Sequence, residues 1–476
     1  MNIPDDAFFA LLEQALRGRG GGTLQRTLYQ TLREAILQGA LAGDSRLPGS
    51  RAMAQRLGLS RNTVNGALEQ LAIEGYLLRS RQGTSVAPLG TQGEGDVEAR
   101  HIVLPEYLQG LPAAIHRDSP TLLFTPGMPA VNYFPLSIWR RLLDRVLREE
   151  GSALLGYGDA QGELVLRKAI ARHLALSRGI RCEASQIVIT EGALEGVDLC
   201  THLLSVAGDT AWVEEPGYPG AKSIFLKSGL HIEGVPVDHE GMRFDSHNDS
   251  EAPRLIFTSP SHQYPCGAVM SARRRLALLE YARRHDSWII EDDYDSEFRY
   301  SGEPIPAMLG MARQAPVVYL GTFSKTLFPS LRIGFMVMPP ALAEAARGGH
   351  RAEQRALAFF IEEGHYARHL AAMRRLYRKR QQQLREILAQ ELRHPYELFG
   401  GEGGLHLTVA IDNVDDLAIV QQAWRFQLAP GALSRFYLDV NTARSGFVLG
   451  YGNTSASHFM AAVRTLSRLI ALDRRG

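Results

Sequence analysis

Short apolar runs, each ending in polar or glycine residues, recur from about Thr121 to the end of the chain. They alternate with helical stretches, and this alternation is typical of an α/β fold with a largely parallel sheet. Four of the runs are predicted to be buried strands, at residues 187–190, 255–258, 288–290 and 317–320. Because open α/β sheets bind ligands beyond the carboxyl ends of their strands, the residues that follow these runs are candidates for a binding site.

The loop after the last of these runs holds a lysine. Lys325 is one of five lysines in the chain, and another apolar run, residues 333–338, follows the loop. A lysine between two buried strands is partly desolvated, which lowers its pKa and makes the amine nucleophilic. Arg332, seven residues on, can bind an anion such as phosphate by a two-pronged hydrogen bond. The alternative is a surface loop with one lysine and one arginine.

Acidic residues follow the run at residues 288–290. Asp292 and Asp293 are predicted to stand at the carboxyl end of that strand, where a carboxylate can hold a pyridinium N–H. Tyr294, next in the chain, can hydrogen-bond a phenolic oxygen. A solvated acidic loop is the alternative interpretation.

Two more motifs complete the pattern. Tyr218 lies on a strand-end loop and suits stacking on a flat ring, although loop packing would also explain it. Gly192 lies in a turn that opens a helix, where backbone N–H groups form a seat for phosphate. Amine, acid, aromatic ring, arginine and glycine turn together match what pyridoxal 5′-phosphate (PLP) requires.

Residues 24–86 are predicted to form a separate small domain. Leucine or isoleucine recurs every fourth residue from Leu24 to Ile36, which predicts an amphipathic helix ending at Gly39. Ser50 is predicted to cap a second helix and Ser60 a third. A two-stranded hairpin around Gly83 is predicted to follow these helices. A helix-turn-helix followed by such a β wing is an arrangement that binds DNA.

The charge of this segment agrees with DNA binding. Between residues 46 and 81 six arginines stand against two glutamates, a local net charge of +4. The start of the third helix is predicted to read base edges through Arg61, Asn62, Thr63 and Asn65. Phosphate contacts are predicted for Arg51, Arg79 and Arg81. The alternative is an arginine-rich bundle without a DNA partner.

The composition between the two regions predicts a linker. Residues 88–120 begin with a glycine-rich polar stretch that is typical of a tether. We therefore expect a DNA-binding domain at 1–87 and an effector domain at 121–476. The effector domain divides into a large part, about 150–345, and a small part, about 346–476.

Composition also bears on location. The three cysteines, Cys182, Cys200 and Cys266, are widely spaced and predict neither a metal site nor a disulfide framework, which fits a reducing compartment. No stretch has the length of a membrane-spanning helix. The predicted location is the cytoplasm, without a membrane partner.

Several motifs of the N-terminal segment closely resemble the winged helix of GntR-family regulators. They are residues 47–51 (LPGSR), residues 57–64 (LGLSRNTV) and residues 71–76, which begin with leucine and end in Gly-Tyr. The resemblance implies that Arg51, Arg61, Thr63 and Gly83 match DNA-contacting positions of the family.

Residues 121–476 resemble fold-type I aminotransferases, a mostly parallel sheet with a smaller α+β domain. With the winged helix in front, the chain resembles the MocR/GabR class of GntR regulators. That resemblance implies a Schiff base between Lys325 and PLP and makes Asp292 the partner of the pyridine nitrogen, with Asp293 beside it as the alternative. It also implies cofactor contacts for Gly192, Ala193, Leu194, Tyr218, Tyr264, Tyr294, Thr322 and Arg332.

One position departs from that family. Aminotransferases hold the substrate carboxylate with an arginine near the C-terminus, and Val448 aligns there. Arg444 lies close by in sequence and is a candidate substitute. Without such an arginine, the effector is either PLP itself or an amino compound held in another way.

These expectations favour a PLP-dependent, sequence-specific transcriptional regulator that senses PLP, an amino compound or both at Lys325. Its predicted partners are double-stranded DNA and a second copy of the chain, because fold-type I sites are commonly built at a two-fold interface. The effector domain is expected to sense rather than catalyse, with a transaminase half-reaction possible. The alternatives are an active aminotransferase with an accessory DNA-binding domain, and a scaffold that binds neither ligand.

Overall fold

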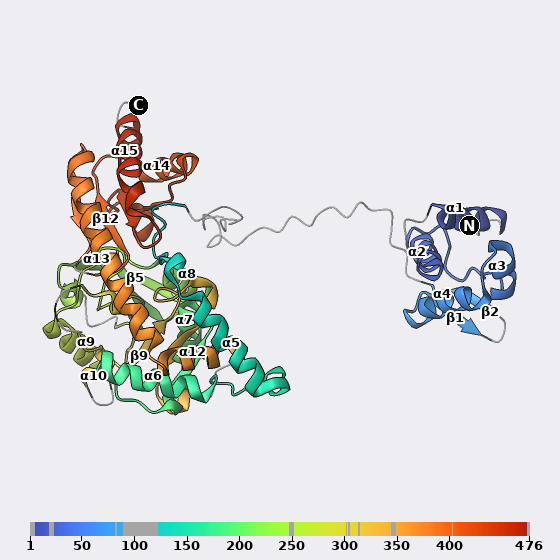
Figure 1. Ribbon diagram of the computed structural model, residues 1–476, viewed down its shortest axis with the longest axis horizontal. Helices are drawn as coiled ribbons and strands as arrows, with labels where there is room; N and C mark the ends of the chain where they lie inside the picture. Colours follow the sequence, from blue (N-terminus) through green and yellow to red (C-terminus); the bar gives the residue numbers. More distant parts are fainter. Residues whose placement is uncertain are drawn as a thin grey trace. The chain divides into compact units, whose positions relative to one another are not determined.

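The computed structural model divides the chain into two compact units, Met1–Leu104 and Pro105–Gly476 (Figure 1). Of the predicted linker, residues 88–120, only Pro88 is among the described residues, so the tether stays a prediction. The structure describes residues 5–18, 23–80, 83–88, 122–246, 252–300, 302, 305–312, 315–343, 349–401 and 403–473.

The described part of the N-terminal unit has four helices followed by a hairpin. Thr23 and Ser60 cap α2 and α4, each accepting a hydrogen bond from a backbone N–H three residues on. The predicted amphipathic helix, third helix and hairpin are confirmed. The elements are α1 (Asp5–Arg17), α2 (Leu24–Leu37), α3 (Ser50–Leu57), α4 (Arg61–Ile73), β1 (Leu77–Ser80) and β2 (Gly83–Val86).

Two details differ from the sequence prediction. Ser50 is the first residue of α3 and Gly49 occupies the cap position without a side-chain hydrogen bond, so the predicted Ser50 cap was wrong by one residue. Helix α1 was not predicted at all. It buries Phe8, Phe9 and Leu12 in the same core as the apolar faces of α2 and α4.

The place of α1 in this core predicts a measurable difference between two adjacent leucines. Leu12 is fully buried, whereas Leu11 is exposed. We expect Leu12→Ala to destabilise the N-terminal unit by about 2–4 kcal/mol and Leu11→Ala by less than about 0.5 kcal/mol. Hydrogen–deuterium exchange in peptides from residues 5–86 measures this, and equal protection in the two variants would contradict it.

The C-terminal unit is built on an eight-stranded sheet with the order β3-β10-β9-β8-β7-β4-β5-β6. Neighbouring strands from β5 to β9 are parallel, β10 is antiparallel to both of its neighbours, and β6 is antiparallel to β5. The predicted, largely parallel α/β sheet is confirmed. The strands are β3 (Ile187–Thr190), β4 (Thr210–Glu215), β5 (His231–Asp238), β6 (Gly241–Met242), β7 (Leu255–Thr258), β8 (Trp288–Asp293), β9 (Val317–Thr322) and β10 (Gly334–Val337).

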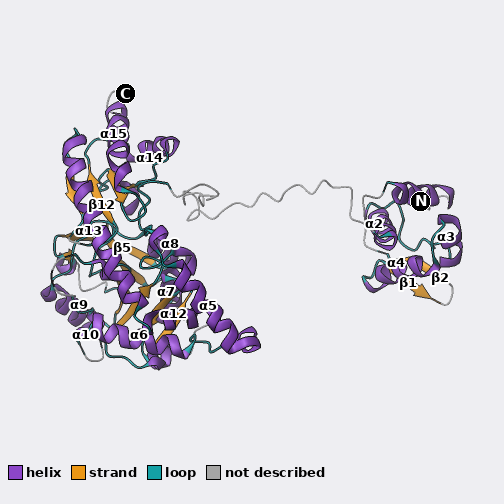
Figure 2. Cartoon of the chain, in the orientation of Figure 1, coloured by secondary structure: helices purple, strands orange, loops and turns teal. Residues whose placement is uncertain are grey.

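Helices cover both faces of this sheet (Figure 2). Successive residues of a strand point to opposite faces. Thus Ile290 of β8 packs in one apolar core with α7 and α8, and Ile289 packs in another with α9 and α10. The helices before and around this sheet are α5 (Leu136–Glu150), α6 (Leu164–Ser177), α7 (Ala193–Leu204), α8 (Pro219–Lys227), α9 (Ala272–Arg284), α10 (Met308–Met311), α11 (Pro340–Ala343) and α12 (Arg351–Glu362).

The long helix α13 (His365–Glu391) leads into a smaller, antiparallel sheet of four strands, in the order β11-β12-β14-β13. This sheet and its two helices form the predicted α+β part. None of the described helices is both long and apolar enough to cross a bilayer. The remaining elements are β11 (Glu397–Phe399), β12 (His406–Ala410), α14 (Asp416–Ala423), β13 (Gly431–Ala432), β14 (Gly446–Gly450) and α15 (Ala456–Asp473).

Candidate functional site

Lys325 lies in the loop that joins β9 to β10 in the large sheet. The loop is fixed at both sides of the lysine. Thr322 accepts a hydrogen bond from the backbone N–H of Ser324 at 3.2 Å, and Thr326 accepts one from the Tyr366 hydroxyl at 3.2 Å. The carbonyl of Thr326 also lies 3.0 Å from Nε2 of His369. These bonds hold the backbone that carries the amine.

Gly127 leaves the space into which the lysine extends. A Cβ atom built on Gly127 would stand 2.9 Å from Nζ of Lys325, and the glycine has a φ of +66°. The positive φ disfavours any side chain here, and a Cβ would require the end of the lysine side chain to shift. Sequence reasoning missed Gly127, because nothing in the sequence relates it to a residue almost 200 positions away.

The two candidate aspartates of β8 face opposite sides of the sheet. Oδ2 of Asp293 lies 2.7 Å from Nε of Arg178 and accepts a hydrogen bond of 2.6 Å from the Tyr319 hydroxyl. Asp292 is equally buried, and Oδ1 of each aspartate has no hydrogen-bond partner among the described residues. Asp293 is engaged through its Oδ2 in a structural ion pair, whereas Asp292 has a buried acceptor without such an ion pair, which a ligand N–H could satisfy.

Burial raises the pKa of Asp292 to about 7, and the neighbouring carboxylates of Asp293, Glu214 and Asp295 add to the effect. The ammonium group of Lys325 acts in the opposite direction on Asp292 and on Asp295. Amine and unpartnered acid are thus electrostatically coupled. In the absence of a cationic or N–H-donating ligand, the Asp292 carboxyl is mainly neutral below about pH 7 and mainly ionised above it, because its pKa is about 7.

This raised pKa predicts how the cofactor-free protein responds to pH. An aspartate with a folded pKa above its unfolded value lowers the free energy of unfolding as pH rises from about 4 to about 7. We expect Asp292→Asn to remove this loss, which makes the variant more stable than wild type at pH 8 by about 2–4 kcal/mol.

Urea unfolding measured at pH 5 and pH 8 tests this prediction. All four tryptophans of the chain lie in the C-terminal unit, so their fluorescence follows this unit alone. A constant difference between wild type and variant at the two pH values would contradict a raised pKa at Asp292.

Tyr218, Tyr264 and Tyr294, the three tyrosines predicted to contact the cofactor, pack against one another. The ring of Tyr218 stacks on Phe257, with centroids 6.4 Å apart and planes at 27°. The edge of Tyr264 meets the rings of Tyr218 at 6.1 Å and Tyr294 at 5.8 Å. Burial raises the pKa of Tyr218 to about 12, Asp292 raises it further, and Arg332 lowers it. The structure therefore brings these predicted aromatic residues together.

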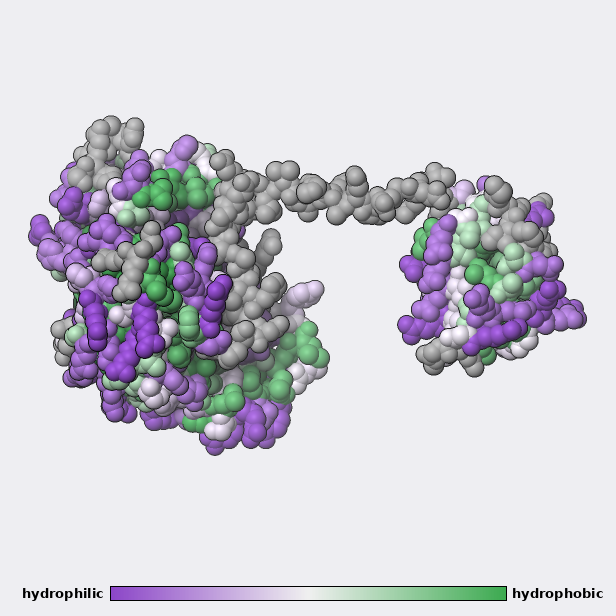
Figure 3. Space-filling view, turned by 90° about the horizontal axis from the view of Figure 1, so that it is seen from above, coloured by the Kyte–Doolittle hydropathy of each residue, from purple (hydrophilic) through white to green (hydrophobic). Residues whose placement is uncertain are grey.

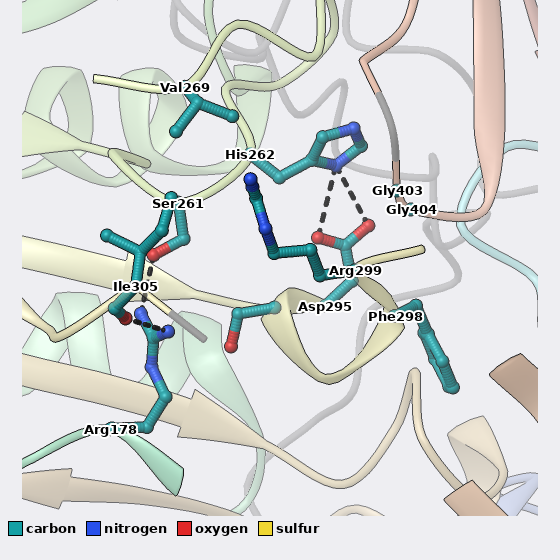
Figure 4. Close-up of a pocket in the computed structure, with 11 residues that line it drawn as sticks. Arg178, Ser261, His262, Val269, Asp295, Phe298, Arg299, Ile305, Gly403 and Gly404 are labelled. Carbon is teal, nitrogen blue, oxygen red and sulfur yellow. Dashed lines mark hydrogen bonds and ion pairs between the residues drawn. The ribbon is translucent and has the colours of Figure 1, made fainter. Parts of the chain in front are cut away.

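The hydroxyl of Tyr294 has a partner that the sequence did not reveal. It lies 3.0 Å from Nδ1 of His262, which is also 3.1 Å from both carboxylate oxygens of Asp295. Figure 4 shows the His262 ring facing this carboxylate beside a small cavity lined by Ser261, Arg178 and other residues. His262 therefore holds the Tyr294 hydroxyl in place, and Asp295 in turn holds the His262 ring.

The predicted phosphate turn is at the N-terminus of α7. Gly192 occupies the cap position with a φ of +100°, and Ala193 is the first helical residue. A Cβ on Gly334 would come within 2.9 Å of Gly192 Cα, and a Cβ on Gly192 would lie 3.7 Å from Nη1 of Arg332. Backbone N–H groups and a guanidinium therefore converge, which favours anion binding. The side chain of Leu194 is exposed and adds no polar group.

Arg444 lies in the loop that precedes β14 of the small sheet. Its Nη1 is 2.8 Å from Oε2 of Glu397, and its guanidinium lies over the ring of Phe399 at 5.5 Å. Val448 is fully buried in an apolar cluster with Phe436 and its neighbours. The carboxylate-binding role of Arg444 stays a prediction, since among the described residues its side chain contacts Glu397 and Phe399, both on β11.

The predicted DNA-contacting residues lie in the N-terminal unit. Arg61 and Asn62 are exposed on the first turn of α4, and the Thr63 hydroxyl lies 2.8 Å from that of Ser60. Asn65, on the same helix, is half-buried. Arg51 and Arg79 are exposed, Gly83 has a φ of +127°, and Arg81 lies outside the described residues.

Residues 24–86 match the family model of bacterial regulatory proteins of the gntR family, and residues 130–429 match that of aminotransferases of class I and II. The chain is 38% identical over 481 residues to the probable rhizopine catabolism regulatory protein MocR of Rhizobium meliloti, with 95% of each chain covered. It is 32% identical to the pyridoxine biosynthesis transcriptional regulator PdxR of Corynebacterium glutamicum, over 94% of this chain and 95% of the relative.

Solved structures agree for the larger unit. The multiple substrate aminotransferase of Thermococcus profundus superposes with a TM-score of 0.69 at 25% identity, over 78% of this chain and 98% of that enzyme. The predicted fold class, a fold-type I body preceded by a winged helix, is confirmed.

Proposed function

Since the chain belongs to the MocR-type subfamily of GntR regulators, we propose that it controls transcription in response to a ligand held at Lys325. The ligand of this site is PLP, alone or together with an amino compound. The response to the ligand is a change in the affinity of the N-terminal unit for operator DNA, which α4 and the β1–β2 hairpin contact.

The residues around Lys325 fit PLP. Aminotransferases of class I and II depend on PLP, and the predicted amine, acid, tyrosines, glycine turn and arginine of this chain support the same ligand. The observation that carries the proposal is the buried Asp292 carboxylate with an unpartnered oxygen, coupled to the Lys325 amine. A pyridinium N–H supplies the missing hydrogen bond, and its positive charge lowers the cost of burying an ionised carboxylate. When bound, PLP supplies an aldehyde that reacts with amines.

Each residue has a distinct role in this proposal. The Lys325 amine binds the aldehyde carbon, and Asp292 keeps the proton on the ring nitrogen. Tyr294 and Tyr264 donate to the ring oxygen, and Tyr218 packs against the ring face. Phosphate is bound by the Gly192 and Ala193 backbone with Thr322 and Arg332, while Leu194 only borders the turn.

The proposed active form is a homodimer. Leu147, Leu155 and Tyr157 are more than half exposed at and beyond the end of α5, and Leu155 is 88% exposed. Figure 3 shows apolar residues gathered at this edge of the larger unit. A second copy of the chain would cover these side chains, and two α4 helices would suit paired half-sites in the major groove.

One preparation of the full chain tests both halves of this proposal. We expect the protein to take up PLP with a change in visible absorbance and to enrich a defined duplex from a random-sequence pool. A protein that takes up no PLP refutes the sensing half. Enrichment of no sequence from the pool refutes the regulatory half.

A further inference from the structure

The first 21 residues of α13 carry an unbalanced positive charge. Residues 365–385 contain six arginines and one lysine and no aspartate or glutamate, in a chain whose formal net charge is only +1. Arginines elsewhere on the surface commonly pair with carboxylates, as Arg145 does with Glu149 and Arg464 with Glu391. The charge of α13 is therefore a local feature.

Some of the seven cations have structural roles. Arg380 is buried and donates to the carbonyl of Gly452. Arg374 donates to the carbonyl of Glu297 at 2.8 Å, and Arg385 donates to that of Gly400. These three side chains bind α13 to the rest of the unit through hydrogen bonds to backbone carbonyls, so they have a structural role.

The other four form an exposed row, which we call the α13 stripe: Arg368, Arg375, Arg378 and Lys379. Arg368 is held near the start of the helix by the carbonyl of Glu363. Within the described residues, no carboxylate pairs with Arg375, Arg378 or Lys379. Spacings of seven, three and one place all four on one side of the helix, over about 16 Å.

We propose that the α13 stripe binds the phosphate backbone of double-stranded DNA. The proposal rests on the DNA binding proposed above and adds a second contact surface on the larger unit. The three guanidinium groups and one ammonium group of the stripe suit phosphates, because a guanidinium donates a forked pair of hydrogen bonds to phosphate oxygens and an ammonium adds a point charge. Both units belong to one chain, so binding of DNA by α4 raises the effective concentration of that DNA for the larger unit.

Charge and composition favour DNA over a bilayer as the partner. An interfacial membrane helix needs an exposed apolar face beside its basic one. The apolar residues of α13, such as Tyr366, Leu370 and Tyr377, are buried in the core of the unit instead, and none of its described residues is an exposed large hydrophobic. Contact through the stripe is therefore purely electrostatic and sensitive to salt.

The test compares two triple variants of the full chain that lose the same charge. The first is Arg375→Gln with Arg378→Gln and Lys379→Gln. The control is Arg273→Gln with Arg283→Gln and Arg284→Gln, three exposed positions on α9. The probe is a mixed-sequence duplex of about 60 base pairs, with Kd measured between about 50 and 200 mM NaCl.

The slope of log Kd against log salt reports how many phosphates are neutralised. We expect the slope of the stripe variant to be smaller than that of wild type by about one to three, and the slope of the control to be unchanged. Equal slopes for the two variants would overturn the stripe as a DNA contact and leave the proposed regulator intact. A wild-type protein that does not bind the duplex would overturn the DNA half of the proposed function itself.

Discussion

Lys325→Ala protein mixed with PLP and freed of excess by gel filtration retains no visible absorbance, whereas wild type retains it. The reason is chemical. Removing the amine removes the only covalent attachment in the proposed site, and the phosphate and ring contacts then hold PLP as a reversible ligand. The exposed Lys227 serves as the matched control, because Lys227→Ala also removes one lysine and leaves the loop after β9 untouched.

Borohydride reduction followed by peptide mapping gives a second reading of the same experiment. In wild type and in Lys227→Ala, the label is expected on the peptide that contains residue 325. A Lys325→Ala protein that keeps the wild-type absorbance would mean that PLP is held by another lysine, and the site proposed between β9 and β10 would then be wrong.

Arg61→Ala weakens binding to a duplex enriched by wild type from a random pool by about 1–3 kcal/mol, roughly 5- to 150-fold. Arg61 is exposed on the first turn of α4, the part of a recognition helix that reaches base edges. Binding to an unrelated duplex is expected to change much less, so the variant loses specificity as well as affinity.

Two comparisons separate base reading from charge. Arg26→Ala removes an exposed arginine from α2 and is expected to leave the Kd for both duplexes nearly unchanged. Arg79→Ala, at a predicted phosphate contact, is expected to weaken both duplexes by the same factor. If Arg61→Ala keeps the wild-type ratio of the two affinities, Arg61 is not a base-reading residue.

Four strands of the large sheet could be predicted because each contains an apolar run that is mostly buried on both faces. β3, β7, β8 and β9 hold these short runs, which can be recognised without knowing which strands they pair with. β5 was not predicted, and most of its residues are only partly buried. Helix α1 was missed although Phe8, Phe9 and Leu12 stand at i, i+1 and i+4, a spacing typical of one face of a helix. The predicted elements began at Leu24, and the pattern was not sought in the first residues of the chain.

The candidate site shows the same division. Residue types at strand ends and the family resemblance indicated Lys325 and Asp292, with Asp293 as the alternative. The ion pair between Asp293 and Arg178 distinguishes the two aspartates and could not be read from the sequence. His262 was missed because its partner, Asp295, lies 33 residues away on another element. Thus the local sequence predicted which residue types the site contains. Contacts between residues far apart in the sequence determine which of their atoms are free to bind a ligand.

The proposed link between cofactor and DNA is tested by measuring the Kd of the full chain for the enriched duplex with and without saturating PLP. Ligand-linked equilibria of this kind typically change affinity by about 5- to 150-fold. We expect a change of at least about fivefold in wild type and none in Lys325→Ala. A wild-type protein that visibly binds PLP while its Kd for the duplex stays constant would contradict the proposal that occupancy at Lys325 controls the grip on DNA.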